Sequence, residues 1–412
     1  MEFTLLARTL LLLRDNHAIV IGFSLVAAIL VAECLSRTFR FPYVTGYLLS
    51  GMAFGPFALG VIDRADMQQL SVFSEIAIGI MLFELGRHLD WRWLRRERRV
   101  MVTAVLESLL IFAAVYGAFA YAGFELQAAG LLGIVGMTTS PVILLAIIGE
   151  THAEGRVSDR ACVFTATNNA LAMLLAVLFI PTINIIRHDH WWLYLQEPLR
   201  ELFGAVIVGM AGGALLILAL TWLRRRSHLQ DALPQALMFG AILGTLGLAE
   251  GLHASPLLAL LTMGVTCRNV GEGAAILGTN LDGLRGLFIC ILFVQIGAGI
   301  NLTAWQDSAT WVLAFLLMRT VVRMLVTASC APLIGMNRKQ GLSLGVALLP
   351  ISSFAVLTVH ASMSALPEMD GQVAAVAMAA LSLLEVVGPF WTRWALRHTG
   401  EAASTKTAYA YG

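Results

Sequence analysis

The sequence predicts an all-α polytopic membrane protein with about thirteen transmembrane helices, two of them discontinuous. Its composition is the first observation: 58% of the 412 residues are hydrophobic and only 13% are charged, too few charged side chains to cover a soluble domain. The second is a series of apolar runs of about 20 residues, the length that crosses a bilayer core of about 30 Å. The third is that one run in each half of the chain is interrupted by a proline among polar residues. Together they predict a protein built inside the membrane.

The apolar runs give approximate limits for each span. The thirteen predicted spans cover residues 17–36, 42–61, 70–88, 100–122, 126–149, 161–183, 198–222, 232–249, 253–267, 284–302, 309–335, 340–363 and 371–392. Residues 3–13 are apolar but too short to span, so we expect them at the membrane interface. The five cysteines show neither a CxxC nor a Cys/His spacing, and no glycine-rich phosphate loop follows a strand pattern. We therefore expect no cofactor, no metal, no nucleic-acid partner and no enzymatic activity.

Basic residues predict the orientation, because short cytoplasmic loops carry the excess of Lys and Arg. Segments that follow odd-numbered spans hold 20 of the 27 basic residues, and segments on the opposite side hold 5. This asymmetry predicts an N-terminus outside and a C-terminus in the cytoplasm. The remaining two, Arg319 and Arg323, lie inside the eleventh span.

Arg319 and Arg323 are four residues apart, so they project from one face of a helix. A charge at the centre of a bilayer is costly, so we expect the pair to face the bundle interior, compensate charge there and meet carboxylates, carbonyls or a substrate. The alternative is that one of them snorkels to an interface or holds two helices together. Glu107 in the fourth span and Glu385 in the thirteenth are candidate partners for these arginines. Burial could instead raise the pKa of either glutamate and make it a proton carrier. Both roles stay open for both residues.

The stretch 161–182 carries the amide pair Asn168 and Asn169 in the middle of an apolar run. Amides at membrane depth must satisfy their donors and acceptors, so an adjacent pair faces other helices, water or a passing solute. We therefore place the functional site at these two residues.

Two other spans are interrupted by proline. Residues 138–141 read TTSP in the fifth span, and residues 350–353 read PISS in the twelfth. Each proline could be a simple kink, because nearby hydroxyls can satisfy the freed carbonyls. One interruption in each half of the chain favours paired discontinuous helices at the midplane, as in transporters built from inverted repeats.

These segments and four others resemble the monovalent cation:proton antiporter family, in the branch with the glutathione-gated potassium efflux systems and bacterial sodium/proton exchangers. The likeness covers nearly the whole membrane chain, and its strength lies in the order and spacing of the fragments. The fragments are FPYVTGYL at 41–48, GPFALG at 55–60, IMLFELG at 80–86, TSP at 139–141, LFVQIGAGINL at 292–302 and the crossing at 350–354.

The resemblance implies a sodium/proton-antiporter-like fold and a division into domains. It implies dimerisation-domain helices within 1–99 and 231–302, core helices within 100–185 and 309–397, a linker helix at 198–222 and a cytoplasmic tail at 398–412. It further implies a homodimer in a bacterial inner membrane that exchanges Na⁺ or K⁺ for protons by movement of the core. A basic residue on the eleventh helix, most like Arg323, would balance the charge of the site.

The chain departs from the family pattern at the sixth helix, where the resemblance implies an aspartate and the sequence has Asn168-Asn169. An amide does not titrate near physiological pH, so one carboxylate cannot exchange proton for cation there. Three interpretations stay open. Another acid, Glu107 or Glu385, carries the proton; or the site, with its arginines, carries an anion or neutral solute; or the protein is a regulatory or sensor relative without transport.

The resulting candidate site gathers groups from four spans. Its predicted ion or substrate ligands are Asn168, Asn169, Thr139, Ser140, Ser352 and Ser353, with Arg323 and Arg319 as charge-compensating residues and Glu107 or Glu385 as proton carrier.

Overall fold

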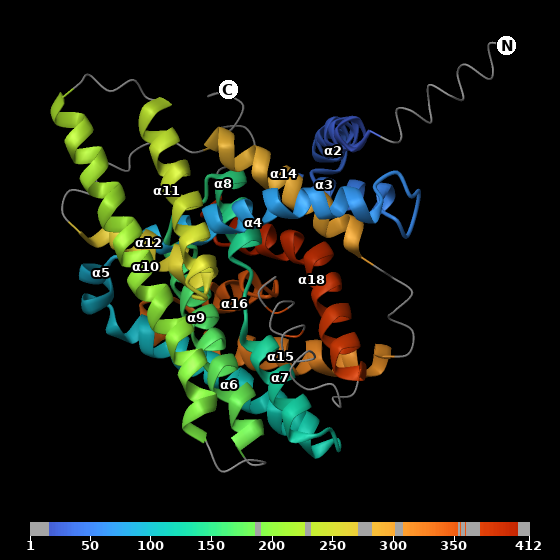
Figure 1. The fold of residues 1–412 in the computed structure, drawn as a ribbon. Helices are drawn as coiled ribbons and strands as arrows, with labels where there is room; N and C mark the ends of the chain where they lie inside the picture. The colour runs from blue at the N-terminus through green and yellow to red at the C-terminus, as the bar shows by residue number, and fades with distance from the viewer. Residues whose placement is uncertain are drawn as a thin grey trace. The chain divides into compact units, whose positions relative to one another are not determined.

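The computed structural model describes residues 16–185, 191–226, 232–270, 282–300, 308–352, 355, 359 and 371–402. Every regular element within them is a helix (Figure 1), so the predicted all-α class is confirmed. The segment 3–13 and the site candidate Ser353 lie outside the described residues.

Each of the thirteen predicted spans contains helix in the described residues. Eight helical segments there are long and apolar enough to cross a membrane: His17–Phe39, Arg64–Arg87, Arg98–Tyr121, Leu126–Thr151, Leu199–Leu223, Leu233–Gly251, Ala309–Ile334 and Gln372–His398. The other predicted spans coincide with α3 (Tyr43–Phe54), α9 (Arg156–Ile185), α12 (Pro256–Asn269), α14 (Asp282–Gly299) and α16 (Arg338–Ala347). The total of thirteen, like the inverted repeats, stays a prediction.

The chain forms two compact units. The first comprises residues 1–78 and 282–302, and its described helices are α2 (His17–Phe39), α3, the first part of α4 (Arg64–Arg87) and α14. Within it, α3 packs on both α2 and α14. Glycines permit the close approach, because a Cβ at Gly51 would meet the backbone of Val294 and one at Gly297 would meet that of Leu48. The backbones of α3 and α14 are therefore in direct contact.

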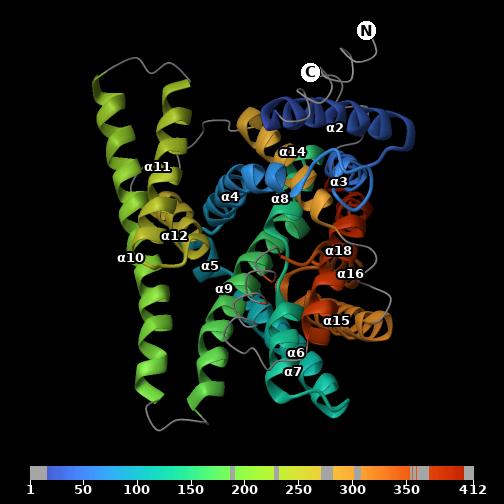
Figure 2. The same ribbon diagram turned by 45° about the vertical axis from the view of Figure 1, so that its right-hand side comes forward.

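The second unit comprises residues 79–281 and 303–412. Here α10 (Trp191–Arg226) packs along α11 (Ala232–Gly251) and α12, as Figure 2 shows. The other helices of the unit are α5 (Trp91–Arg96), α6 (Arg98–Tyr121), α7 (Leu126–Met137), α8 (Pro141–Thr151), α9, α15 (Ala309–Cys330), the short 3-10 helix η2 (Ala331–Ile334), α16 and α18 (Gly371–His398). One apolar core joins α6, α7, α9, α15 and α18.

The predicted interruption of the fifth span is present. Helix α7 ends at Met137 and α8 begins at Pro141. Ser140 caps α8, because its hydroxyl accepts a hydrogen bond from the Ile143 amide at 3.3 Å, and a proline at the first helical position loses no internal hydrogen bond. The change of helix thus follows directly from the sequence TTSP.

The predicted twelfth span is also interrupted. Helix α16 stops at Ala347, and residues 349–352 are not helical. The two interruptions touch, because the Ser140 amide donates to the Pro350 carbonyl at 2.9 Å. The non-helical segments that follow α7 and α16 are therefore in direct contact, although they lie far apart in the sequence.

Candidate functional site

Asn168 lies on α9 and is fully buried. Its side-chain amide nitrogen donates to the Glu107 carboxylate at 2.9 Å, and its oxygen accepts from the Ser108 hydroxyl at 2.6 Å. Both partners belong to α6. The amide thereby has one donor and its oxygen bonded within a single contact between α9 and α6.

Glu107 pairs with Arg323 of α15 at 2.6 Å, and both side chains have no solvent-exposed surface. Helix α15 presents its polar groups inward: Arg319 and Arg323 are buried, whereas Leu317 and Val321 on another face are exposed. Two buried charges are tolerated only when they are paired and their remaining donors and acceptors are bonded. The guanidinium of Arg323 meets this condition by also donating to the carbonyls of Met137, at 3.2 Å, and Leu348.

Arg319 is bound by backbone carbonyls. It donates to Gly136 and Thr138, each at 2.7 Å, and to Leu349. These carbonyls lie at or just beyond the ends of α7 and α16, where the last carbonyls have no helical partner and carry partial negative charge. The two helix interruptions therefore leave carbonyl oxygens free to accept hydrogen bonds, and the guanidinium groups of the two arginines donate to them.

Asn169 lies beside this charged group and makes a different set of contacts. Its amide nitrogen donates to the carbonyls of Thr139, at 2.6 Å, and Thr165, at 2.8 Å. Its side-chain oxygen and the hydroxyls of Thr139 and Thr165 are buried and have no hydrogen-bond partner among the described residues. A buried polar atom without a partner costs about 1–3 kcal/mol, and all three atoms belong to Asn169 or to the two residues whose carbonyls it contacts.

The structure brings together most of the predicted site residues. Asn168, Glu107, Arg323 and Arg319 form one hydrogen-bonded group with the carbonyl ends of the interrupted helices, and Asn169 joins it through Thr139. Ser140 acts through its backbone and its cap, as described above, and Ser352 is buried beside Ile351. Glu385 is buried on α18, and its role as a proton carrier stays a prediction.

Sequence reasoning missed one side chain of this group, Ser108. It follows Glu107 directly, and a polar pair in an apolar run was the available signal. Thr165 lies within the predicted site stretch 161–182, four residues before Asn169. Carbonyls were among the expected partners of the arginines, but a backbone carbonyl has no side-chain signature, so no pattern could have identified which ones they meet.

The amino end of α9 is closed by a residue from the other end of the chain. The Glu401 carboxylate accepts from the amides of Val157 and Ser158, at 2.7 and 2.8 Å, and from the Ser158 hydroxyl at 2.9 Å. A carboxylate at a helix N-terminus satisfies free amides and the helix dipole. Gly155 has a φ of +156°, and a Cβ there would collide with Glu401. The helix that carries Asn168 and Asn169 is thus anchored to residues after α18.

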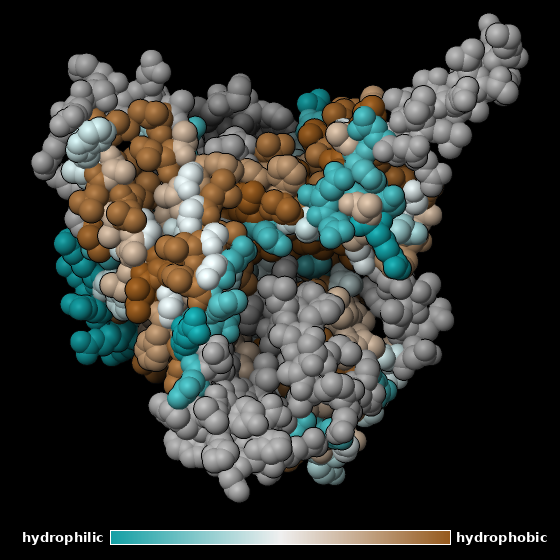
Figure 3. Space-filling model, viewed as in Figure 1, coloured by the Kyte–Doolittle hydropathy of each residue, from teal (hydrophilic) through white to brown (hydrophobic). Residues whose placement is uncertain are grey.

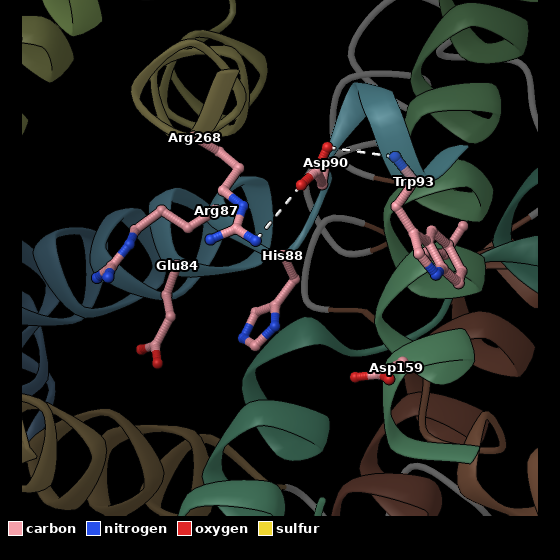
Figure 4. A pocket seen from close by; sticks show the side chains of 8 residues that line it. Glu84, Arg87, His88, Asp90, Trp93, Asp159 and Arg268 are labelled. Atoms are coloured by element: carbon pink, nitrogen blue, oxygen red, sulfur yellow. Dashed lines mark hydrogen bonds and ion pairs between the residues drawn. The ribbon is translucent and has the colours of Figure 1, made fainter. Parts of the chain in front are cut away.

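A polar cavity of about 420 Å³ lies in the second unit near the same end of α9. Figure 4 shows its lining residues, which are Glu84, Arg87, His88, Asp90, Trp93, Asp159, Val163 and Arg268. The surrounding protein raises the pKa of Asp159, chiefly by desolvation, and desolvation lowers the pKa of His88. The cavity reaches α9 at Asp159 and Val163. The Val163 carbonyl accepts from the Thr167 hydroxyl at 2.8 Å, one turn further along the same helix.

Comparison with known proteins adds the family context. A family model described as "Sodium/hydrogen exchanger, transmembrane" matches residues 24–398. The chain is similar in structure to the sodium proton antiporter MjNhaP1 from Methanocaldococcus jannaschii at pH 8, with a TM-score of 0.62, 18% sequence identity and coverage of 92% of this chain and 94% of that chain. A second structure of MjNhaP1, from electron microscopy, gives a TM-score of 0.63 at 17% identity, with the same coverage of 92% and 94%. At these identities the likeness is one of fold.

Proposed function

Because the chain belongs to the sodium/hydrogen exchanger family, a family of multi-pass membrane transporters and not of enzymes, we propose that it exchanges a monovalent cation, Na⁺ or K⁺, for protons. The observation that carries this proposal is the buried Glu107 carboxylate, which contacts both Arg323 and the Asn168 amide. The Glu107 carboxylate supplies an acidic group in contact with Asn168. The sixth predicted span has only amides, Asn168 and Asn169, at this position.

Glu107 is the proposed proton carrier. In its ionised form it accepts hydrogen bonds from Arg323 at 2.6 Å and from Asn168 at 2.9 Å. A proton on the carboxyl would remove the charge attraction to Arg323 and convert one acceptor into a donor. Proton uptake would thereby loosen the contact between α6 and α15, and proton release would restore it.

The proposed cation ligands are the oxygen of Asn169 and the hydroxyls of Thr139 and Thr165. All three oxygens are buried and lack a hydrogen-bond partner in the described part of the chain. Alkali cations bind such oxygen ligands, and neutral ligands keep their binding capacity at every physiological pH. In this arrangement the proton binds to Glu107 and the cation binds at the neighbouring Asn169, Thr139 and Thr165. The two compete through the repulsion between their positive charges and do not share one carboxylate.

The polar cavity is the proposed access route from the cytoplasm. It combines the acidic residues Glu84, Asp90 and Asp159 with the basic residues Arg87 and Arg268. Its wall at Val163 lies one helical turn from Thr167, next to Asn168. The orientation follows the excess of basic residues, with the N-terminus outside and the C-terminus in the cytoplasm of a cell whose inner membrane holds the protein as a homodimer.

A second candidate is an anion or neutral solute carrier, and one observation favours it. The group described above holds two buried guanidinium groups, Arg319 and Arg323, and one carboxylate, that of Glu107, so it has an excess of positive charge. Partial negative charge at the ends of α7 and α16 offsets part of this excess. A bound anion would offset the rest without any titrating residue, whereas a bound cation would add to it. A third candidate is a regulatory relative without transport.

Transport by purified protein in liposomes separates these candidates. With a pH gradient imposed and a pH-sensitive dye inside, Na⁺ or K⁺ should dissipate the gradient in a protein-dependent manner. Flux that requires chloride or another anion, and ignores the cation, would establish the second candidate. Folded protein that responds to no cation and no anion would support the third.

The Glu107 role is tested by Glu107→Gln in the same liposomes, with Glu154→Gln as matched control because Glu154 is exposed. Cation-dependent proton flux should fall at least about a hundredfold in the first variant, the scale typical of losing a proton-transfer group, and stay unchanged in the second. Full activity of Glu107→Gln would remove Glu107 from the mechanism and turn attention to Glu385.

A further inference from the structure

Helix α5 and the start of α6 carry a concentrated basic surface. Arg92, Arg95, Arg96, Arg98 and Arg99 are all exposed, and none of them forms an ion pair within the part of the chain that the structure describes. Figure 3 shows this region as a hydrophilic patch over α5. We refer to these five side chains as the arginine surface. Five unpaired guanidinium groups within eight residues indicate a partner of opposite charge.

The arginine surface is held in a fixed conformation. Asp90 caps α5 by accepting from the amides of Arg92 and Trp93, at 2.8 and 3.3 Å, and Leu94 is buried beneath the helix. The Asn269 side chain at the end of α12 accepts from the Trp91 amide at 2.7 Å and donates to the Leu89 carbonyl at 2.8 Å. The short helix is therefore attached to its own unit, and its arginines point away from it.

Its position along the chain places this surface at the membrane boundary. The candidate span Arg64–Arg87 ends four residues before α5 begins, and the candidate span Arg98–Tyr121 begins two residues after α5 ends. Trp91, at the start of α5, is 52% exposed, and tryptophan prefers the headgroup level of a bilayer. A helix between two spans, with exposed arginines and an exposed tryptophan, lies at the depth of the phosphates.

We propose that the arginine surface binds the phosphates of anionic phospholipids. Guanidinium groups bind phosphate through paired, charge-assisted hydrogen bonds, and each basic residue near an anionic leaflet contributes about 1 kcal/mol. The bound lipid fixes α5 between Asn269 at the end of α12 and the helix α6 that carries Glu107. The inference rests on the membrane location of the chain and not on the ion it transports.

The test compares two double variants that remove the same charge from the same predicted side. Arg95→Gln/Arg96→Gln weakens the arginine surface, and Arg338→Gln/Lys339→Gln removes two exposed basic residues at the start of α16. The purified proteins are placed in nanodiscs of phosphatidylcholine with increasing phosphatidylglycerol, and the melting temperature is recorded. Fifteen or more basic residues on that side remain in each variant, so the topology is preserved.

Phosphatidylglycerol should raise the melting temperature of the wild type and of the Arg338/Lys339 variant alike. The Arg95/Arg96 variant should need about tenfold or more phosphatidylglycerol for half of that rise, as expected for two arginines at about 1 kcal/mol each. An unchanged requirement, or an equal loss in both variants, would overturn the proposal. So would an equal rise with inorganic phosphate in place of the anionic lipid.

Discussion

The two asparagines of α9 are adjacent in sequence, yet they belong to two different kinds of polar environment. Asn168 belongs to a charged, hydrogen-bonded group: its amide nitrogen donates to Glu107, its oxygen accepts from Ser108, and Glu107 also pairs with Arg323. Asn169 is in an unsaturated one, where three buried oxygens have no partner among the described residues. The difference separates a charge-paired group, where Glu107 is the proposed proton carrier, from a neutral group, where the proposed ligand is a cation.

This comparison also shows how a helix can hold both functions within one turn. Neighbouring residues on a helix point about 100° apart, so Asn168 faces α6 while Asn169 faces the interruption between α7 and α8. Substitutions on each side of α9 test whether the two environments are independent. We expect the effects on stability to be largest at the buried ion pair, smaller at Asn169 and smallest at the amino end of α9 and in the polar cavity.

The largest effect is expected for Arg323→Met. This change leaves Glu107 buried without its cation, and breaking one half of a buried pair costs about 3–5 kcal/mol. The melting temperature and the yield of folded protein should both fall sharply. The double variant Arg323→Met/Glu107→Leu should recover much of the loss, because an apolar pair replaces a charge pair at little cost. A single variant as stable as the wild type would show that the charge group is not structural.

The next effect is expected for Asn169→Asp. An ionised carboxylate would lose the donors to Thr139 and Thr165 and face their carbonyl oxygens, which costs about 1–3 kcal/mol. The loss in melting temperature should be greater at pH 8 than at pH 5, where a protonated carboxyl can donate one hydrogen bond. Saturating Na⁺ or K⁺ should restore stability at pH 8, by about 2.7 kcal/mol at a hundred times the Kd. Asn169→Leu is the control and should lose stability equally at both pH values, without recovery by cations.

A smaller effect is expected for Glu401→Gln at the amino end of α9. The amide keeps one acceptor but loses the charge that faces the amides of Val157 and Ser158. Loss of such a cap costs about 0.5–2 kcal/mol. Hydrogen exchange at these two amides should accelerate, while exchange at Asn168 and Asn169 should not. Glu154→Gln, which keeps the backbone contact of residue 154 with Glu401, should leave the exchange rates unchanged.

The smallest effect is expected in the polar cavity, which Asp159 and His88 line. The folded protein raises the pKa of Asp159, so the stability from its neutral form is present at low pH and lost as pH rises through that pKa. Asp159→Asn should therefore melt above the wild type at pH 8, and the difference should vanish as pH falls toward about 4. His88, whose pKa is lowered, gives the opposite trend. The melting temperature of His88→Gln should rise relative to that of the wild type as pH falls below about 6.5.

The helices could be predicted well from the sequence because lipid-length apolar runs leave few alternatives. Both interruptions were also predictable, since a proline beside hydroxyl residues ends a helix on identifiable grounds. The limits were less accurate where a helix continues beyond its apolar run: α10 extends from Trp191 to Arg226, whereas the predicted span covers 198–222. Helix α5 has no counterpart among the predicted spans, because it has only six residues and three of them are arginines.

The members of the candidate site were easier to predict than its contacts. A buried charge or amide in an apolar run is visible in a sequence, and so Glu107, Asn168 and Arg323 were found. Which carboxylate meets which arginine depends on the packing of helices more than 200 residues apart in the chain, as the separation of 216 between Glu107 and Arg323 shows. The capping of α9 by Glu401 depends on a separation of 244 residues and had no local pattern.

The pairing of α15 with earlier helices has a consequence for how the chain is made. A segment with two central arginines enters a bilayer at a cost of about 2.5–3.5 kcal/mol for each of them. The groups that compensate Arg319 and Arg323 in the first half of the chain, Glu107 and the carbonyls of Gly136 and Thr138, leave the ribosome roughly 180 to 220 residues earlier. The order of synthesis therefore supplies a polar receptor before the arginines emerge, and α15 is expected to insert by docking onto helices already in the membrane.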